Sequence, residues 1–435
     1  MKKAIIRKLF VRIALLSYLT MNCIMSAQPK GYNYEESKVP QFELPPLLQT
    51  DDLIKINTLK EWQNIRRPEI LNHLKNEIYG KNILPLEQIK IKSEVIEQGD
   101  FKLGIRKQIK IEFKRGLKKV NLNLTAFFPK HSAKAVPIFV GYNFKGNHTV
   151  NFDKNIIVTE SWVRSTKGSK NNQASKLDRG IAASRWDLES ILARGYGLIT
   201  AYYGDIDPDY NDGFKNGVHS LLDDNRKPKQ NNGGSIDAWA WGLSRIVDYV
   251  KTDAVFDGSK IIVIGHSRLG KSALWAGALD DRIAMVISNN SGCGGAAISR
   301  RRFGETIKRI NTSFPHWFCE NYKKYNDNED ACAVDQHSLL SLIAPRPLYV
   351  ASASEDLWAD PHGEFMSLCA VEPVYKLYGY NWDDTWNGRT KKMPKPDQPI
   401  LGRMSYHLRS GKHDITSYDW ARYLDFADYN FTKAN

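Results

Sequence analysis

Six short apolar runs, separated by stretches of helical or loop character, constrain the fold of this chain more than any other feature. They lie at residues 136–140, 197–201, 261–264, 284–287, 347–351 and 404–408. Runs of this kind are typical of parallel strands that are buried on both faces. Residues 235–251 have the apolar spacing of a helix that crosses between two such strands. The sequence therefore predicts the α/β class, as a three-layer αβα sandwich around a mostly parallel central sheet.

The segments before these runs show other patterns. Apolar and polar side chains alternate over residues 107–113 and 120–124, which indicates antiparallel strands with one exposed face. Residues 62–78 have helical spacing, and residues 28–60, rich in Pro, Tyr and Glu, are expected to form an extended N-terminal arm. Because no internal repeat divides the remainder, residues 61–435 are predicted to form a single domain.

The first 27 residues have the pattern of a secretory signal peptide. Five basic residues precede an apolar run over residues 13–25, and the small residues Ser26 and Ala27 follow it. The run is shorter than the ~20 residues that a membrane span needs. We therefore expect cleavage near Ala27 and a secreted or periplasmic bacterial protein without a membrane span. Cys23 raises lipidation as an alternative, but residues 20–22 lack the small side chains of a lipoprotein signal.

The chain is basic, with a formal net charge of +14, and loss of the five basic residues in 1–27 would leave +9. Such a charge suits a nucleic acid, an anionic membrane surface or an acidic polymer. The acidic polymer fits a secreted protein best, and the chain has no recognisable nucleic-acid-binding module. With no CxxC pair or His-rich cluster, no metal or other cofactor is expected, and we expect a monomer.

Four cysteines follow the signal peptide: Cys293, Cys319, Cys332 and Cys369. In an oxidising compartment they allow up to two disulfides, and the sequence leaves their pairing open.

The strongest chemical signal is the turn that follows the run at 261–264. Gly265 and Ser267 come next, and residues 269–279 have helical spacing. A strand, a sharp turn and a helix form the nucleophile elbow of α/β-hydrolases, which exposes a serine oxygen to a base. The second glycine of the usual G-x-S-x-G pattern lies one position later, at Gly270. A serine that only caps the helix is the alternative interpretation.

The remaining members of a catalytic triad follow in the order that this fold uses, first the acid and then the histidine. Asp356 lies just beyond the run at 347–351, and its neighbour Glu355 is the alternative acid. His413 lies in a glycine-containing loop after the last run, where it can reach the serine. His407, the rival histidine, lies within that run, and packing explains it better.

An ester hydrolase also needs donors for the oxyanion. The backbone N–H of Arg268 is the usual first donor in this fold, and the loop at 142–148 is a source of the second. The Arg268 guanidinium has three open roles: it can bind the oxyanion, bind a substrate carboxylate, or pair with a nearby aspartate.

These residues resemble a known family, the glucuronoyl esterases of carbohydrate esterase family 15. The resemblance runs through nearly all of the mature chain, in segments 34–40, 203–208, 265–271, 288–295, 303–305, 314–318, 344–347, 355–361 and 411–414. It implies the α/β-hydrolase fold for the catalytic domain at 61–435. It also implies an enzyme without a metal that cleaves the ester between a 4-O-methyl-glucuronic acid branch of xylan and a lignin alcohol.

The resemblance implies roles for individual residues as well. Ser267 is then the nucleophile, His413 the base and Arg268 a support for the oxyanion, while Lys271, Glu305 and Trp358 hold the glucuronoyl sugar.

Two positions depart from family members. Many carry their acid as a glutamate where this chain has Asn290, so Asp356 must act as the acid here. His266 stands where fungal members have a cysteine, and a disulfide at that position is therefore excluded.

The sequence thus predicts a secreted serine esterase, a carboxylic ester hydrolase of the 4-O-methyl-glucuronoyl methylesterase type that acts through an acyl-enzyme. Its partner would be glucuronoxylan or a lignin-carbohydrate ester. An acetyl or methyl esterase acting on plant cell-wall polysaccharide is the alternative. A carbohydrate-binding protein without catalysis is disfavoured because all three triad residue types are present.

Overall fold

The computed structural model describes residues 28–81, 84–166, 168–222, 229–381 and 392–432. The chain divides into two compact units, residues 1–32 and residues 33–435, and the fold described below belongs to the second. The predicted signal peptide and Cys23 lie outside the described residues. Within the described ranges, no helix combines the length and the apolar character needed to cross a bilayer.

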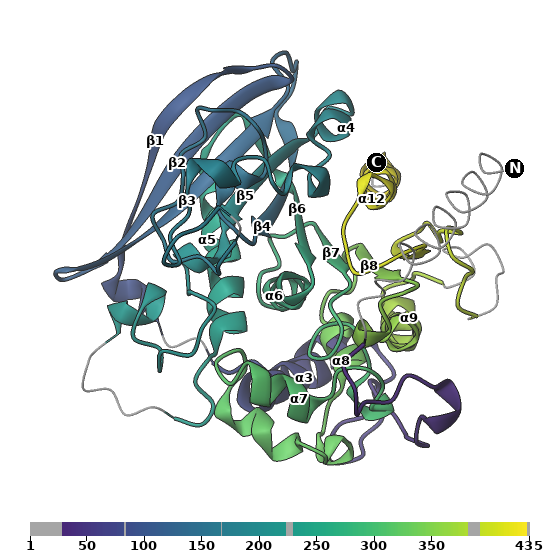
Figure 1. The fold of residues 1–435 in the computed structure, drawn as a ribbon. Helices are drawn as coiled ribbons and strands as arrows, with labels where there is room; N and C mark the ends of the chain where they lie inside the picture. Colours follow the sequence, from purple (N-terminus) through teal and green to yellow (C-terminus); the bar gives the residue numbers. More distant parts are fainter. Residues whose placement is uncertain (1–27, 82–83, 167, 223–228, 382–391, 433–435) are drawn as a thin grey trace, which may run out of the picture. The chain divides into compact units, whose positions relative to one another are not determined.

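In the described part of the chain, nine strands form one sheet in the order β1-β2-β3-β5-β4-β6-β7-β8-β9 (Figure 1). The first three strands form an antiparallel meander, and β3 also pairs antiparallel with β5. From β5 to the far edge at β9 all neighbours are parallel. The strands are β1 Lys90–Phe101, β2 Gly104–Arg115, β3 Lys118–Phe128, β4 Val136–Asn143, β5 Gly197–Tyr202, β6 Phe256–His266, β7 Met285–Asn289, β8 Leu348–Ala353 and β9 Met404–Arg409.

Each of the six apolar runs forms a strand of the sheet. Their side chains are apolar on both sides because helices cover both faces of the central sheet. In β6, Ile261 and Val263 belong to one core and Ile262 and Ile264 to the other. Helices α5 (Ser235–Thr252) and α6 (Arg268–Leu279) pack in the first core, and α4 (Leu188–Ala193) and α12 (Ser417–Thr432) pack in the second. The predicted αβα sandwich of the α/β-hydrolase kind is confirmed.

The predicted helix over residues 62–78 is present, but its two ends, Trp62–Arg66 and Leu74–Ile78, are π-helical. Before it, the arm is tied to the rest of its unit by hydrogen bonds to its carbonyls. The Pro45 oxygen accepts from His337 Nε2 at 2.8 Å, and the Pro46 oxygen accepts from Arg66 at 3.0 Å. The other α-helices are α2 Leu59–Glu61, α3 Arg67–His73, α7 Ile307–Ser313, α8 Gln336–Ser341, α9 Pro361–Ala370 and α10 Glu372–Leu377.

The disulfides that the sequence allowed for do not form among the described residues. Cys293, Cys319, Cys332 and Cys369 are all free thiols. The first three are buried in the protein interior, where a cysteine packs as a small apolar side chain. Burial also raises the pKa of the Cys319 thiol to about 12, so that thiol is held in its protonated, unreactive form.

The packing of α6 on β6 depends on Gly265. A Cβ at this position would lie 2.0 Å from the carbonyl oxygen of Leu269, so Gly265→Ala must push the helix away from the strand. We expect the free energy of unfolding to fall by about 2–3 kcal/mol, the cost of overpacking a core. Chemical denaturation measures it, with Gly258→Ala as the control, because a Cβ there meets its nearest atom at 3.3 Å. Equal losses in the two variants would contradict the prediction.

Candidate active site

Ser267 occupies the turn between β6 and α6 in a backbone conformation that non-glycine residues rarely adopt. Its φ is 58° and its ψ is −131°, which costs energy unless the surroundings hold it. Its N–H donates to the Asn289 carbonyl, and its own carbonyl accepts from Gly270, both at 2.8 Å. The side chain makes no capping hydrogen bond to α6. Helix capping therefore does not account for this serine.

His413 meets Asp356 across the C-terminal ends of β8 and β9. The His413 Nδ1 lies 2.5 Å from the Asp356 Oδ2, and the same oxygen accepts from Asn290 Nδ2 at 2.8 Å. The Asp356 side chain is buried, whereas the His413 side chain is 40% exposed. Glu355 is exposed and is tied through its backbone N–H to the Gly411 carbonyl at 2.9 Å. Of the two candidate acids, Asp356 is therefore the one paired with the histidine.

His407 has a different environment. It is fully buried in β9, with Nε2 at 2.8 Å from Asp419 Oδ1 and Nδ1 at 2.9 Å from the Tyr349 hydroxyl. Both ring nitrogens are thus engaged, and neither is available to a serine. The packing role that the sequence suggested for His407 agrees with this geometry.

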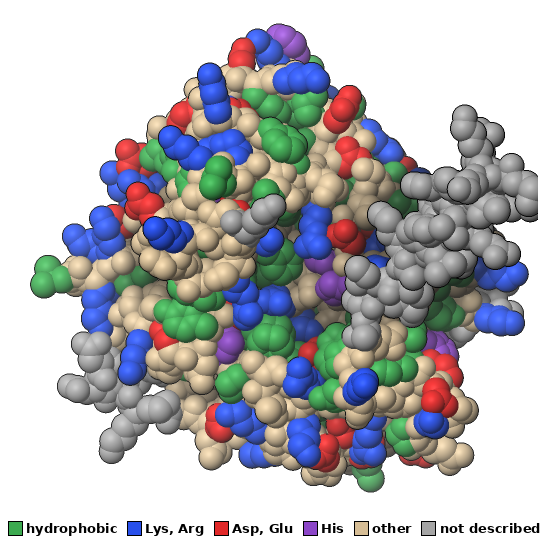
Figure 2. Space-filling model, viewed as in Figure 1, with side chains coloured by type: hydrophobic (Ala, Val, Ile, Leu, Met, Phe, Trp, Pro, Cys, Tyr) green, Lys and Arg blue, Asp and Glu red, His purple; other side chains and the backbone are tan. Residues whose placement is uncertain are grey.

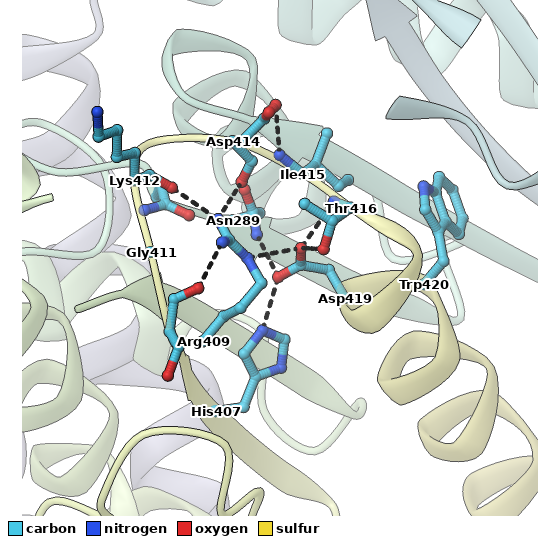
Figure 3. A network of polar contacts seen from close by, with 12 residues as sticks. Asn289, His407, Arg409, Gly411, Lys412, Asp414, Ile415, Thr416, Asp419 and Trp420 are labelled. Carbon is cyan, nitrogen blue, oxygen red and sulfur yellow. Dashed lines mark hydrogen bonds and ion pairs between the residues drawn. The ribbon is translucent and has the colours of Figure 1, made fainter. Parts of the chain in front are cut away.

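Asp419, at the start of α12, holds the loop that carries His413 (Figure 3). It accepts hydrogen bonds from the Thr416 N–H at 2.7 Å and the Thr416 hydroxyl at 2.8 Å, and lies 2.9 Å from Arg409 Nε. Arg409 in turn donates to the carbonyls of Lys412 at 2.7 Å and Asp414 at 3.1 Å. Buried charges that are paired and hydrogen-bonded fix their surroundings, so this network sets the position of the loop.

Arg268, directly after the serine, forms an ion pair with Asp209. Its guanidinium also lies over the Trp317 ring, 5.0 Å from the centroid, which is a cation–π arrangement. Of the three roles left open for this side chain, pairing with a nearby aspartate is the one that this geometry displays.

Asp209 is completely buried and collects several donors. Besides Arg268, these donors are Trp317 Nε1 at 2.8 Å, the Tyr203 hydroxyl at 2.9 Å, His316 Nε2 at 3.0 Å and Arg164 Nη2 at 3.1 Å. Burial alone would raise the pKa of Asp209, but these hydrogen bonds and charges hold it well below the usual value. The carboxylate is therefore ionised and fixes the arginine in place.

The loop at 142–148 lies against the elbow. Asn143 folds it, since its Oδ1 accepts from the Gly146 N–H at 2.8 Å and its Nδ2 donates to Asn147 Oδ1 at 2.7 Å. Phe144 projects from this loop, with its ring centroid 6.0 Å from the His266 ring and 5.7 Å from the Arg268 guanidinium carbon.

His266 packs on the histidine that is paired with Asp356. The His266 and His413 ring centroids are 4.6 Å apart, and His266 Nδ1 lies 2.5 Å from Asn289 Oδ1. Burial, with the nearby His413, lowers the pKa of His266 well below its usual value. His266 is therefore neutral and adds no positive charge beside His413.

The residues expected to bind the sugar lie on α6 and in the segments that follow β7 and β8. Lys271, on α6, is buried and donates to the carbonyls of Ser291 and Cys293, the latter at 2.5 Å. Burial lowers the pKa of Lys271 and raises that of Glu305, and the attraction between the two opposes both shifts. The Glu305 N–H donates to the Trp358 carbonyl at 3.0 Å, so the structure brings these residues together. Figure 2 shows basic, histidine and apolar side chains gathered in the hollow near the middle of the view.

Glu364, on α9, is an additional anchor that sequence reasoning missed. Its Oε1 accepts from the N–H groups of Ser291 and Gly292 at 2.7 and 2.9 Å, and its Oε2 accepts from the Ser352 hydroxyl at 2.6 Å. Complete burial raises the pKa of Glu364 to about 8.

Among the described residues, no group of His, Cys, Asp or Glu side chains has the geometry of a metal site.

Comparison with known proteins places this chain in a family. Residues 227–379 match the family model for fungal glucuronyl esterases. Over 417 residues the chain is 47% identical to carbohydrate esterase MZ0003 from an unknown prokaryotic organism, covering 93% of this chain and 94% of that protein. The glucuronoyl esterase structure from Solibacter usitatus is 42% identical with a TM-score of 0.83, over 91% of this chain and 100% of that one.

This chain belongs to carbohydrate esterase family 15. A further family 15 structure, a promiscuous esterase from a marine bacterial metagenome, is 45% identical with a TM-score of 0.85 and covers 92% of this chain and 100% of that one. The resemblance inferred from the sequence is confirmed. As a glucuronoyl esterase relative, the family 15 protein described here is a carboxylic ester hydrolase.

The ion pair between Asp209 and Arg268 should contribute to the free energy of unfolding of this family 15 esterase. Asp209→Asn leaves buried cationic and N–H donors without a charged partner, so the free energy of unfolding should fall by about 3 kcal/mol at pH 7. Because folding lowers the pKa of Asp209, its stabilisation is present above the ordinary aspartate pKa of about 4 and declines below it. Urea unfolding at pH 7 and pH 3 should show the gap between wild type and variant narrowing at pH 3.

The control for this experiment is Asp52→Asn, which changes an exposed carboxylate. It should alter the free energy of unfolding by less than about 0.5 kcal/mol. A gap for Asp209→Asn that widens toward pH 3 would count against the assigned ion pair.

Proposed function

We propose that the protein is a secreted serine esterase that hydrolyses the ester between (4-O-methyl-)glucuronic acid of glucuronoxylan and lignin alcohols. The observation that carries the proposal is the His413 and Asp356 pair, with Nδ1 to Oδ2 at 2.5 Å, beside the strained turn of Ser267. The proposed catalytic domain comprises residues 61–435, it acts as a monomer, and residues 1–27 direct its export.

In the proposed mechanism, His413 Nε2 takes the proton of Ser267 as the serine oxygen attacks the ester carbonyl. Asp356 accepts from His413 Nδ1 and stabilises the imidazolium. The oxyanion is bound by the N–H of Arg268, with a second donor from the loop at 142–148. His413 then protonates the leaving alcohol, and an acyl-enzyme remains on Ser267. Water, activated by the same histidine, releases the uronic acid.

The uronate specificity of the proposal rests on Lys271, Glu305 and Trp358. A glutamate and a lysine can hydrogen-bond sugar hydroxyls, and a tryptophan offers an apolar face to a ring. Support comes from the half-buried positions of Glu305 and Trp358 and from the electrostatic coupling of Glu305 to Lys271. In this scheme Arg268 supports the oxyanion while Asp209 holds its guanidinium.

Asn290 takes a different role from the glutamate of many family members. An amide carries no charge, so it cannot serve as the partner of an imidazolium. Here its Nδ2 donates to Asp356 Oδ2 at 2.8 Å, and thus orients the carboxylate that does carry the charge.

The second candidate function is an acetyl or methyl esterase acting on plant cell-wall polysaccharide. The 45% identical relative described as promiscuous favours it. A higher kcat/KM on acetyl esters than on glucuronate esters would rank this function first.

The triad assignment predicts the rates of three variants on benzyl glucuronate, with and without its 4-O-methyl group. Ser267→Ala should lower kcat by about 10⁴-fold or more because it removes the nucleophile, and Asp356→Asn by about 100-fold or more because it leaves the imidazolium unpaired. Glu355→Gln is the matched control and should change kcat less than about twofold, since Glu355 does not pair with His413. If Glu355→Gln is the slower of the two acid variants, Asp356 is the wrong acid.

The sugar site predicts a selective effect of Glu305→Gln. This change should lower kcat/KM on methyl glucuronate by about tenfold, the size of one lost charged hydrogen bond. On 4-nitrophenyl acetate, which has no sugar, the effect should be less than about twofold. Parallel losses on both esters would show that Glu305 supports the triad and does not bind the uronate.

A further inference from the structure

A cavity of about 330 Å³ lies beside the elbow. One part of its wall is Gly265 and His266, the two residues before Ser267. Another part is Asp414 and Ile415, the two residues after His413. Lys271, Glu305 and Trp358 do not line it. The cavity thus adjoins the residues that flank the nucleophile and the base, and the mechanism above places no part of the substrate in it.

The position of the base decides which half of an ester faces this cavity. His413 must return its proton to the alcohol oxygen, so that oxygen has to lie on the histidine side of the tetrahedral intermediate. In the proposed function, Lys271 and Glu305 hold the acyl half. A group carried by the alcohol is directed past the His266 and His413 rings, whose centroids are 4.6 Å apart.

The wall of the cavity is suited to an aromatic group. Phe144, Trp186 and Ile181 line it together with Ile415. A cavity of about 150 Å³ holds a benzene ring, so about 330 Å³ accommodates a ring with a short side chain or ring substituents. A polar edge is supplied by Arg185 and Asp414, whose ion pair has an N–O distance of 2.7 Å.

Apolar side chains continue outward from Ile181 along its loop. Ile181 is 47% exposed, Leu177 is 82% exposed and Phe152 is 72% exposed. The Phe152 ring packs against Gly180, where an added Cβ would lie 2.3 Å from the ring. Large apolar side chains that cluster on a surface commonly mark a binding site, and this cluster borders the cavity.

From these observations we infer that the cavity is the binding site for the aryl group of the leaving alcohol, with Phe144, Trp186 and Ile181 as its contacts. The inference rests on the proposed function, because it assumes an ester whose alcohol half carries an aromatic ring. In arylalkyl alcohols such a ring lies two to four bonds from the ester oxygen.

The test fills the cavity with Ser184→Trp, since Ser184 is an exposed residue of its wall. The kcat/KM of wild type and variant is measured on 3-phenylpropyl glucuronate and on methyl glucuronate. We expect the ratio of the arylalkyl to the methyl ester to fall about tenfold in the variant, since one apolar contact is worth about 1–3 kcal/mol in discrimination. Ser132→Trp, at an exposed serine of the loop between β3 and β4, is the matched control and should keep the wild-type ratio.

A second measurement does not depend on turnover. Saturation-transfer NMR should detect 3-phenylpropanol bound to wild type and to Ser132→Trp, and a much weaker signal with Ser184→Trp. An unchanged ester ratio together with equal binding of the alcohol by all three proteins would overturn the inference while the esterase function stands. Alcohol binding that Ser184→Trp abolishes, in a protein without glucuronate turnover, would support the site and refute the proposed function.

Discussion

The close contact between α6 and β6 is the constraint on which the rest of the site depends. It forces Ser267 into a positive φ and leaves no room for a side chain at Gly265. The second glycine of the elbow, Gly270, faces β7 and the residues after it. A Cβ there would lie 2.9 Å from Ser291 Cβ and 3.2 Å from Ser288 Oγ, so these residues determine where that glycine must fall.

Three buried carboxylates then fix the segments around the elbow. Asp209 holds Arg268, Asp419 holds the loop of His413, and Glu364 holds the backbone at Ser291. They achieve this in different charge states. Cationic partners keep Asp209 ionised, whereas Glu364 has no cation bonded to it and its pKa rises to about 8. The candidate site of this family 15 protein is thus positioned by acidic side chains that are themselves buried.

The apolar runs predicted the central strands well because a strand buried on both faces needs nearly every side chain to be apolar. The strand-turn-helix geometry at Ser267 and the position of Asp356 after β8 could also be predicted, since both lie next to such strands. Asp209, Asp419 and Glu364 could not be. Asp209 and Glu364 pair with residues distant in sequence, such as Arg268 at 59 positions from Asp209. Asp419 pairs with residues of the neighbouring strand and loop, but a single acid in a loop or helix carries no local pattern. The free cysteines were equally unpredictable, because composition does not reveal whether two thiols meet in the interior.

The hydrogen bond between Asn290 and Asp356 has a wider consequence. β7 and β8 are parallel neighbours, so Asn290, after β7, and Asp356, after β8, lie side by side, and Asn290 and His413 contact the same Asp356 oxygen. In the proposed mechanism, an acid after either strand can therefore lie close to the same histidine. A lineage that acquires an acid after β8 is released from the need to keep one after β7. In the proposed mechanism, the catalytic acid is thus defined by the sheet edge, and sequence position alone is a poor guide to whether a relative has lost it.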